Sequence, residues 1–175
     1  MVRKAKAKPE RPKYTVFRDN NEHDNHGWWF GPSDSCAGTI EKNLYTADYS
    51  LDGYYDDKYF VVERKGTVSE FVGNITHKEK WDDFKNELVR LEEFTHPFVI
   101  CEFPLACLKS FPVDSDIPKH IWPRLRVNPN FLMKRMQEIE MHFKTKFIFC
   151  DTQSFAWEYV CGLFKRVVDS RGPQA

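Results

Sequence analysis

The chain has 175 residues, 41% of them hydrophobic and 15% aromatic, which is enough to fill the core of one globular domain. Lys and Arg together number 26, and so do Asp and Glu, so the formal net charge is zero. This balance excludes a protein that attracts nucleic acid through its overall charge, and any site for phosphates must be a local patch.

The N-terminal third predicts a basic tail followed by β-strands. Residues 1–13 carry six Lys or Arg side chains and two prolines, which is typical of a disordered segment that either solubilises the chain or contacts phosphates. A strand is expected near residues 14–18, followed by a long polar loop with several Gly and Pro residues. Strands at 44–50 and 58–63, separated by a turn-forming Asp-Gly pair, should be antiparallel neighbours.

The rest of the chain predicts strands that alternate with helices. Apolar residues that recur every three or four positions predict helices at 68–75, 79–94, 131–143 and 155–168. A continuous apolar run at 98–103 indicates a buried central strand, and a short strand is expected at 146–150, with the proline-rich stretch 104–129 as irregular structure. The predicted fold class is α/β, with a mixed β-sheet flanked by helices on both sides.

We expect one domain over residues 14–170, with disordered tails at 1–13 and 171–175. The five cysteines are an odd number and form no Cys-x-x-Cys pair, so they indicate reduced thiols. No stretch approaches 18 uncharged apolar residues, and no Gly-rich phosphate loop occurs. These features predict an intracellular, cytoplasmic protein with no membrane contact and no nucleotide cofactor.

The segment that indicates a chemical function most clearly contains Asp48, Glu63 and Lys65. Side chains alternate along a strand, so the Glu and Lys two residues apart share one face, and Asp48 is expected at the end of the neighbouring strand. Two carboxylates can hold Mg²⁺ or Mn²⁺, which prefer oxygen ligands. By spacing alone, the same pattern also fits an ordinary surface ion pair.

The sequence around these residues resembles the XPF-type nuclease domain, a branch of the PD-(D/E)XK, restriction-endonuclease-like superfamily. The resemblance covers roughly residues 14–168, and its motif counterparts are Asp19-Asn20-Asn21-Glu22, Ala47-Asp48-Tyr49, Val62-Glu63-Arg64-Lys65 and Glu70-Phe71. The chain departs from the family pattern where Asn21 replaces an Arg, Ala47 replaces a Gly, and the acid after Glu-Arg-Lys comes one residue late as Glu70. The family's helix-hairpin-helix module has no counterpart here.

The resemblance implies a metal-dependent DNA endonuclease that uses Mg²⁺ or Mn²⁺, with branched or structured DNA in repair or recombination as the expected substrate. It implies Asp48, Glu63 and Lys65 as catalytic residues, with Lys65 as the base that orients water. Metal ligands would be Asp19, Asp48 and Glu63, and second-sphere or DNA-contacting residues would be Glu22, Arg64, Glu70 and Arg90. For Arg64, a structural salt bridge is an equal alternative to a phosphate contact. A homodimer or heterodimer is a further expectation, and exposed apolar surface on the helix at 155–168, probed at Phe164, is the first place to seek it.

The main alternative is a catalytically silent module that keeps the nuclease fold and binds DNA or a protein partner, which the zero net charge would suit. Glu102, an acid inside an apolar strand, must be paired or placed at a site. Trp28, Trp29 and Phe30 are interpreted as loop core rather than as a platform on which bases stack.

Overall fold

The computed structural model describes residues 13–22 and 27–171. The predicted tails at 1–13 and 171–175 therefore lie outside the described residues, apart from Lys13 and Arg171. Arg171 is the last residue of the final helix. None of the helices in the described part of the chain has the length and apolarity needed to cross a membrane.

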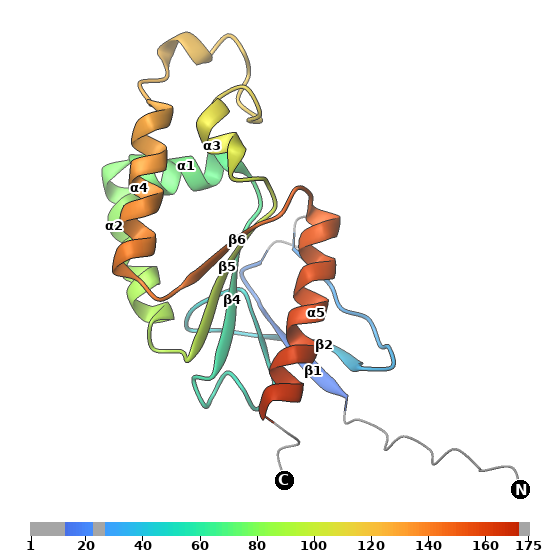
Figure 1. Cartoon of the computed structure of the whole chain (residues 1–175). Coiled ribbons are helices and arrows are strands. Elements are labelled where there is room, and N and C mark those ends of the chain that lie inside the picture. Colours follow the sequence, from blue (N-terminus) through green and yellow to red (C-terminus); the bar gives the residue numbers. More distant parts are fainter. Residues whose placement is uncertain (1–12, 23–26, 172–175) are drawn as a thin grey trace, which may run out of the picture.

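The centre of the molecule is a six-stranded mixed sheet with the strand order β2-β1-β3-β4-β5-β6 (Figure 1). Strand β1 is parallel to β2 and antiparallel to β3, β3 is antiparallel to β4, and β4, β5 and β6 are parallel to one another. The strands are β1 (Tyr14–Asp19), β2 (Cys36–Lys42), β3 (Tyr49–Leu51), β4 (Phe60–Lys65), β5 (His96–Cys101) and β6 (Lys146–Phe149).

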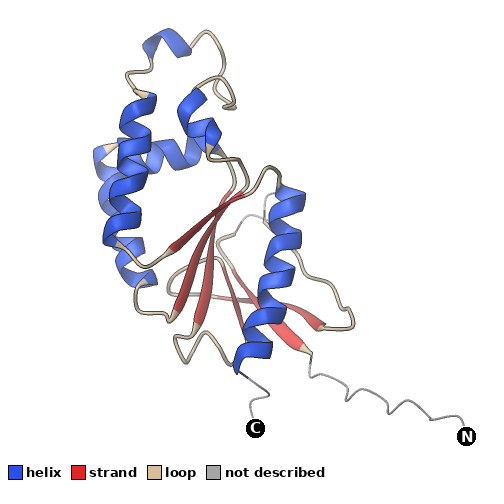
Figure 2. Cartoon of the chain, in the orientation of Figure 1, coloured by secondary structure: helices blue, strands red, loops and turns tan. Residues whose placement is uncertain are grey.

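Helices cover both faces of the sheet, as the sequence predicted (Figure 2). One apolar core joins β4 and β5 to the helices on one side. A second core joins β1, β3, β4 and β5 to α5 on the other side. The helices are α1 (Val68–Thr76), α2 (Lys78–Leu91), α3 (Ala106–Ser110), α4 (Pro129–His142) and α5 (Gln153–Arg171), with a 3₁₀ turn η1 (Trp122–Arg124) between α3 and α4.

Most predicted elements are confirmed, and the differences have physical reasons. Strand β2 lies where a long loop was predicted, because only one residue of this edge strand is buried and its sequence shows no apolar alternation. Residues 44–48, predicted as strand, form a loop in which Ala47 has a φ of 67°, a left-handed conformation that no strand residue adopts. The region predicted to be irregular contains α3 and η1.

The topology gathers polar residues at one edge of the sheet. Parallel strands β4 and β5 end at the same edge, where Gly66 and Glu102 follow them. Strand β3 runs antiparallel to β4, so the residue that precedes it, Asp48, reaches the same edge. The backbone N–H of Asp48 donates to the carbonyl of Val62 at 3.1 Å, which fixes this position. Three strand ends therefore converge where the sequence places its carboxylates.

Candidate active site

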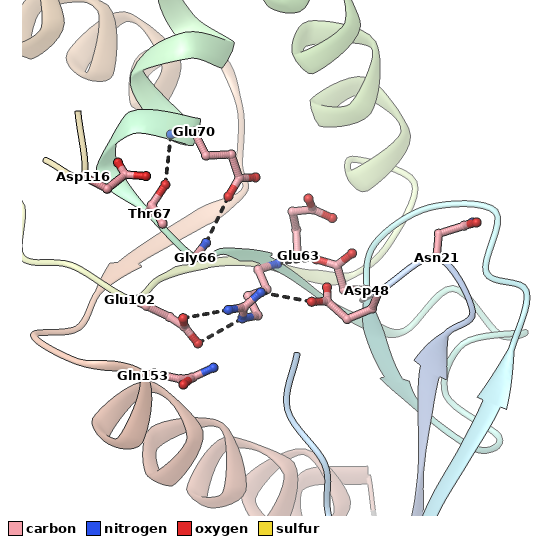
Figure 3. Close-up of a pocket in the computed structure, with 11 residues that line it drawn as sticks. Asn21, Asp48, Glu63, Gly66, Thr67, Glu70, Glu102, Asp116 and Gln153 are labelled. Carbon is pink, nitrogen blue, oxygen red and sulfur yellow. Dashed lines mark hydrogen bonds and ion pairs between the residues drawn. The ribbon is translucent and has the colours of Figure 1, made fainter. Parts of the chain in front are cut away.

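A cleft of about 560 Å³ opens at this edge of the sheet (Figure 3). It collects side chains from the loop after β1, the ends of β4 and β5, the start of α1, the segment after α3, and the start of α5. Its lining is strongly polar and consists of Asn21, Glu22, Asp48, Glu63, Arg64, Gly66, Thr67, Glu70, Glu102, Asp116 and Gln153.

Asp48 and Glu63 lie next to each other at one side of the cleft (Figure 3). Burial, followed by the negative charges of Glu63 and Glu22, raises the pKa of Asp48 well above its usual range. Burial is also the main reason that the pKa of Glu63 rises to about 8, and the nearby Glu87 adds to it. Two carboxyl groups with raised pKa values and a shared cleft form a site that a cation would stabilise in the ionised form.

Lys65 lies behind this pair, on the same face of β4 as Glu63. Its Nζ is 2.6 Å from Glu63 Oε1 and 3.7 Å from carboxylate oxygens of both Glu70 and Glu87. Burial alone would lower the pKa of Lys65, but the surrounding carboxylates outweigh burial and raise it above the ordinary value. Lys65 is therefore an ammonium donor in this structure, and one positive charge is shared among several acids.

Arg64 points to the opposite side of β4 from Glu63 and is held in a buried ion-pair network. Its Nε and Nη2 donate to the two carboxylate oxygens of Glu102 at 2.9 and 2.8 Å, and its Nη1 donates to Glu22 Oε1 at 3.0 Å. The Trp28 indole N–H donates to Glu102 at 2.7 Å. Glu102, expected to be either paired or placed at a site, is paired and also lines the cleft, and the arrangement of Arg64 is that of a structural salt bridge.

The backbone N–H of Arg64 has a separate role, because it donates to Asp48 Oδ2 at 2.6 Å. This bond orients the Asp48 carboxylate, and no hydrogen bond from the described residues engages its other oxygen. The strand that carries Glu63 and Lys65 thus also positions Asp48.

Helix α1 begins at the cleft with an N-terminal cap. The Thr67 hydroxyl oxygen accepts from the N–H of Glu70 at 3.1 Å, and the Glu70 carboxylate accepts from the N–H of Gly66 at 3.2 Å. This reciprocal pattern resembles a capping box and satisfies donors that a helix start leaves free. It holds the Glu70 carboxylate at the cleft and within 3.7 Å of Lys65.

Besides Lys65, which lies behind Glu63, two predicted site residues, Asp19 and Arg90, lie outside the cleft lining. Asp19 is buried, and its two oxygens accept from the backbone N–H groups of Leu44 and Asn21 at 2.8 and 3.1 Å, so both are used to hold loops. Arg90, near the end of α2, lies over the ring of Tyr45 at 5.8 Å. The metal-binding role of Asp19 and the DNA-contacting role of Arg90 stay predictions.

The site also includes residues that the sequence did not single out, in the cleft lining or in contact with Lys65 behind it. Glu87 on α2 contacts Lys65, and Asp116 and Gln153 line the cleft from distant parts of the chain. No spacing signal identified them, because only the packing of α2, of the connection after α3 and of the start of α5 brings them here. The loop-core prediction is confirmed for Trp28 and Phe30, each 2% exposed, and is wrong for Trp29, which is 58% exposed.

Within residues 13–22 and 27–171, no group of three or more Asp, Glu, His or Cys side chains is arranged as a complete metal site. Asp48 and Glu63 are the residues that could hold a metal ion here. Mg²⁺ typically takes only one or two protein carboxylates and completes its coordination with water and substrate phosphate. Two adjacent carboxylates on an open cleft therefore fit such an ion.

Comparison with known proteins shows the family to which the chain belongs. The model of the ERCC4 domain matches residues 12–163. The chain belongs to the ERCC4 domain family. This agrees with the XPF-type nuclease resemblance of the motifs, and the ERCC4 domain of this chain is thus of the nuclease type. No match to a curated protein was found.

Two solved structures share the fold of this ERCC4 domain. XPF from Aeropyrum pernix is 19% identical, and the match covers 89% of this chain and 68% of that chain, with a TM-score of 0.57. XPF from Aeropyrum pernix in complex with DNA is 20% identical and matches 93% of this chain and 69% of that chain, with a TM-score of 0.58. Both likenesses support the predicted mixed sheet with helices on both sides.

Proposed function

We infer that this ERCC4 domain is a metal-dependent DNA endonuclease that hydrolyses phosphodiester bonds at the cleft. The observation that carries the proposal is the meeting of Asp48 and Glu63 in one cleft, with Lys65 directly behind Glu63. The XPF structure that was determined with DNA supports DNA as the substrate class. Branched or otherwise structured DNA is the expected form of that substrate.

Asp48 and Glu63 would hold Mg²⁺ or Mn²⁺. When bound, such an ion supplies positive charge for the phosphate and makes a bound water more acidic. The polypeptide contributes the positioning of these groups. The Arg64 N–H fixes one oxygen of Asp48, and the Lys65 ammonium fixes one oxygen of Glu63.

The protonation state of Lys65 limits its role. Because carboxylates surround it and keep its pKa above the ordinary value, it donates hydrogen bonds and does not accept a proton. We therefore assign Lys65 to orienting water and stabilising developing negative charge beside Glu63. A general base would have to be a different group or a second state of this cluster.

The test is cleavage of labelled single-stranded, duplex, flap and junction DNA by the full chain in Mg²⁺, Mn²⁺ or a chelator. Wild type should cut in a metal, and Asp48→Asn, Glu63→Gln and Lys65→Met should each lose activity by at least about a hundredfold. A matched control is Asp83→Asn, an exposed acid on α2, which should cut like wild type. If wild type cuts none of the four DNAs in either metal, the catalytic proposal fails and the silent binding module replaces it.

A dimer is a second part of the proposal, and the outer face of α5 is its candidate surface. Phe155 is 50% exposed and Trp157 is 40% exposed on this helix, whereas Phe164 is fully buried against rings from the sheet. Phe164 is thus unsuitable as the surface probe that the sequence suggested. Phe155→Glu should lower the sedimentation mass if α5 forms the contact, and an unchanged mass would refute this surface.

A further inference from the structure

The chain has no net charge, yet one segment beside the cleft is strongly basic. Residues 117–137 contain five Lys or Arg side chains and no Asp or Glu, although the whole chain carries 26 of each kind. We call this segment the basic stretch. It runs from the loop after α3 through η1 into α4. A local patch is what a neutral protein needs in order to bind phosphates.

Three cations of the basic stretch are available to a ligand. Lys119, Arg124 and Arg126 are exposed, and within the described residues they make no ion pair. The other two are engaged, because Lys134 and Arg135 pair with Glu138 on α4. The charges of Arg124 and Arg126 are therefore not paired with an acid from the described residues.

Packing fixes the direction of the two arginines. Leu125 and Val127 are partly buried and pack against the apolar core on this side of the sheet, whereas Arg124 and Arg126 alternate with them and are exposed. The Trp122 indole N–H donates to the carbonyl of Ile117 at 2.8 Å and closes the preceding loop. The arginines are therefore presented outward from an anchored segment.

The basic stretch begins at the cleft. Asp116, the residue immediately before it, lines the cleft together with Glu70 of α1 and Thr67, the cap of that helix (Figure 3). The segment between α3 and α4 extends beyond the helices at the edge of the sheet to which β4 and β5 point (Figure 1). A DNA strand in the cleft would have its flanking phosphates near this segment.

We propose that the basic stretch binds the sugar-phosphate backbone of duplex DNA next to the cleft, with Arg124 and Arg126 as its main contacts. The proposal rests on the DNA-cleaving function inferred above and names where the substrate is gripped. Guanidinium groups suit this role because they donate two parallel hydrogen bonds to a phosphate. Backbone contacts carry no sequence information, so the grip is independent of DNA sequence.

The experiment measures binding of short fluorescein-labelled duplex DNA to the full chain in a chelator, so that no cleavage is needed. The double variant Arg124→Ala/Arg126→Ala should bind on the order of tenfold more weakly at moderate salt. Its slope of log affinity against log salt should fall by up to about 1.8, because each lost phosphate contact removes about 0.9. Arg124→Lys/Arg126→Lys keeps the charge and should retain most of the slope.

The matched control is Lys144→Ala/Lys146→Ala, which removes the same charge at the other end of the sheet. Both lysines lie near His96, at the start of β5. Burial is the main cause that lowers the pKa of this histidine, and the charges of the two lysines lower it further. This control should bind DNA like wild type. Circular dichroism and thermal unfolding of both double variants should match wild type, since all four side chains are exposed.

The outcomes separate this inference from the proposed activity. Unchanged affinity and slope in the arginine variant, or equal weakening in the lysine control, would overturn the inference even if wild type cleaves DNA. Wild type that binds no DNA in the chelator would overturn it as well. Arginine-dependent binding without cleavage in any metal would support the inference and refute the endonuclease.

Discussion

Arg64 and Glu102 form a two-bonded ion pair between the end of β4 and the residue after β5, with N–O distances of 2.9 and 2.8 Å. Both side chains are less than a tenth exposed. The pair joins the two central parallel strands at the edge where the cleft opens. The backbone N–H of the same Arg64 donates to the Asp48 carboxylate and orients it. One residue therefore stabilises the sheet end and positions a candidate metal ligand.

Arg64→Ala should destabilise the protein strongly, because it leaves Glu102 and Glu22 with no positive partner in a buried place. Breaking a buried pair from one side costs about 3–5 kcal/mol, and partial exposure at the cleft puts this site near the lower value. Denaturant unfolding measures the loss. Lys85→Ala, which breaks the exposed Lys85–Asp82 pair, should cost under about 1 kcal/mol. Equal, small losses in both variants would contradict the structural role of Arg64.

The fold could be predicted wherever burial imposes a pattern on the sequence. Strand β5 is buried along nearly its whole length and reads as an apolar run, and α2 shows its apolar stripe at Phe84, Leu88 and Leu91. Strand β2 could not be predicted, because this edge strand gains its stability from backbone pairing with β1 and buries only one of its side chains fully. Backbone pairing with a neighbouring strand leaves no periodic hydrophobic pattern in the sequence.

The site was predictable only in the parts that neighbouring strands supply. Asp48, Glu63 and Lys65 follow from strand alternation and the motif, and the structure brings them together. Glu87 was missed because a Glu on the polar side of an amphipathic helix looks like any solvated residue. The assignment of Asp19 could not be refined from sequence, since the backbone hydrogen bond from Leu44 to its carboxylate depends on the path of the 43–48 loop.

Glu87 should set the pH range in which the Glu63 site works. Its charge and its hydrogen bond both raise the pKa of Glu63, after the larger effect of burial. Glu87→Gln removes the charge and should move the Glu63 pKa down. The pH profile of Mn²⁺ binding, measured by calorimetry, should then shift to lower pH, whereas Asp83→Asn on the same helix should leave it in place. A profile unmoved by Glu87→Gln would exclude this coupling.

The metal-free protein should lose stability as the pH rises from about 4.5 toward 8. The pKa of Glu63 is raised from 4.5 to about 8, mainly by burial, so between these values the folded state binds more protons than the unfolded state. Stability therefore falls with increasing pH over this window, by an amount on the order of a few kcal/mol. Thermal unfolding in a chelator across this range tests the sign. Glu63→Gln should flatten the decline, and a melting temperature that rises toward pH 8 in wild type would refute the assignment.

Thr67→Ala should separate the helix-capping contribution at the cleft from ordinary helix stability. The Thr67 hydroxyl caps α1, and its loss should cost about 1 kcal/mol. Asn128→Ala removes the corresponding cap of α4, a helix whose start does not line the cleft, and should cost about as much.

Only the Thr67 variant loosens the turn that holds Glu70 within 3.7 Å of Lys65, so only that variant should also weaken Mn²⁺ binding. Thr67→Ser should restore both properties because it keeps the hydroxyl. If Asn128→Ala weakens Mn²⁺ binding as much as Thr67→Ala does, the effect is one of global stability, and the first turn of α1 has no specific role in the site.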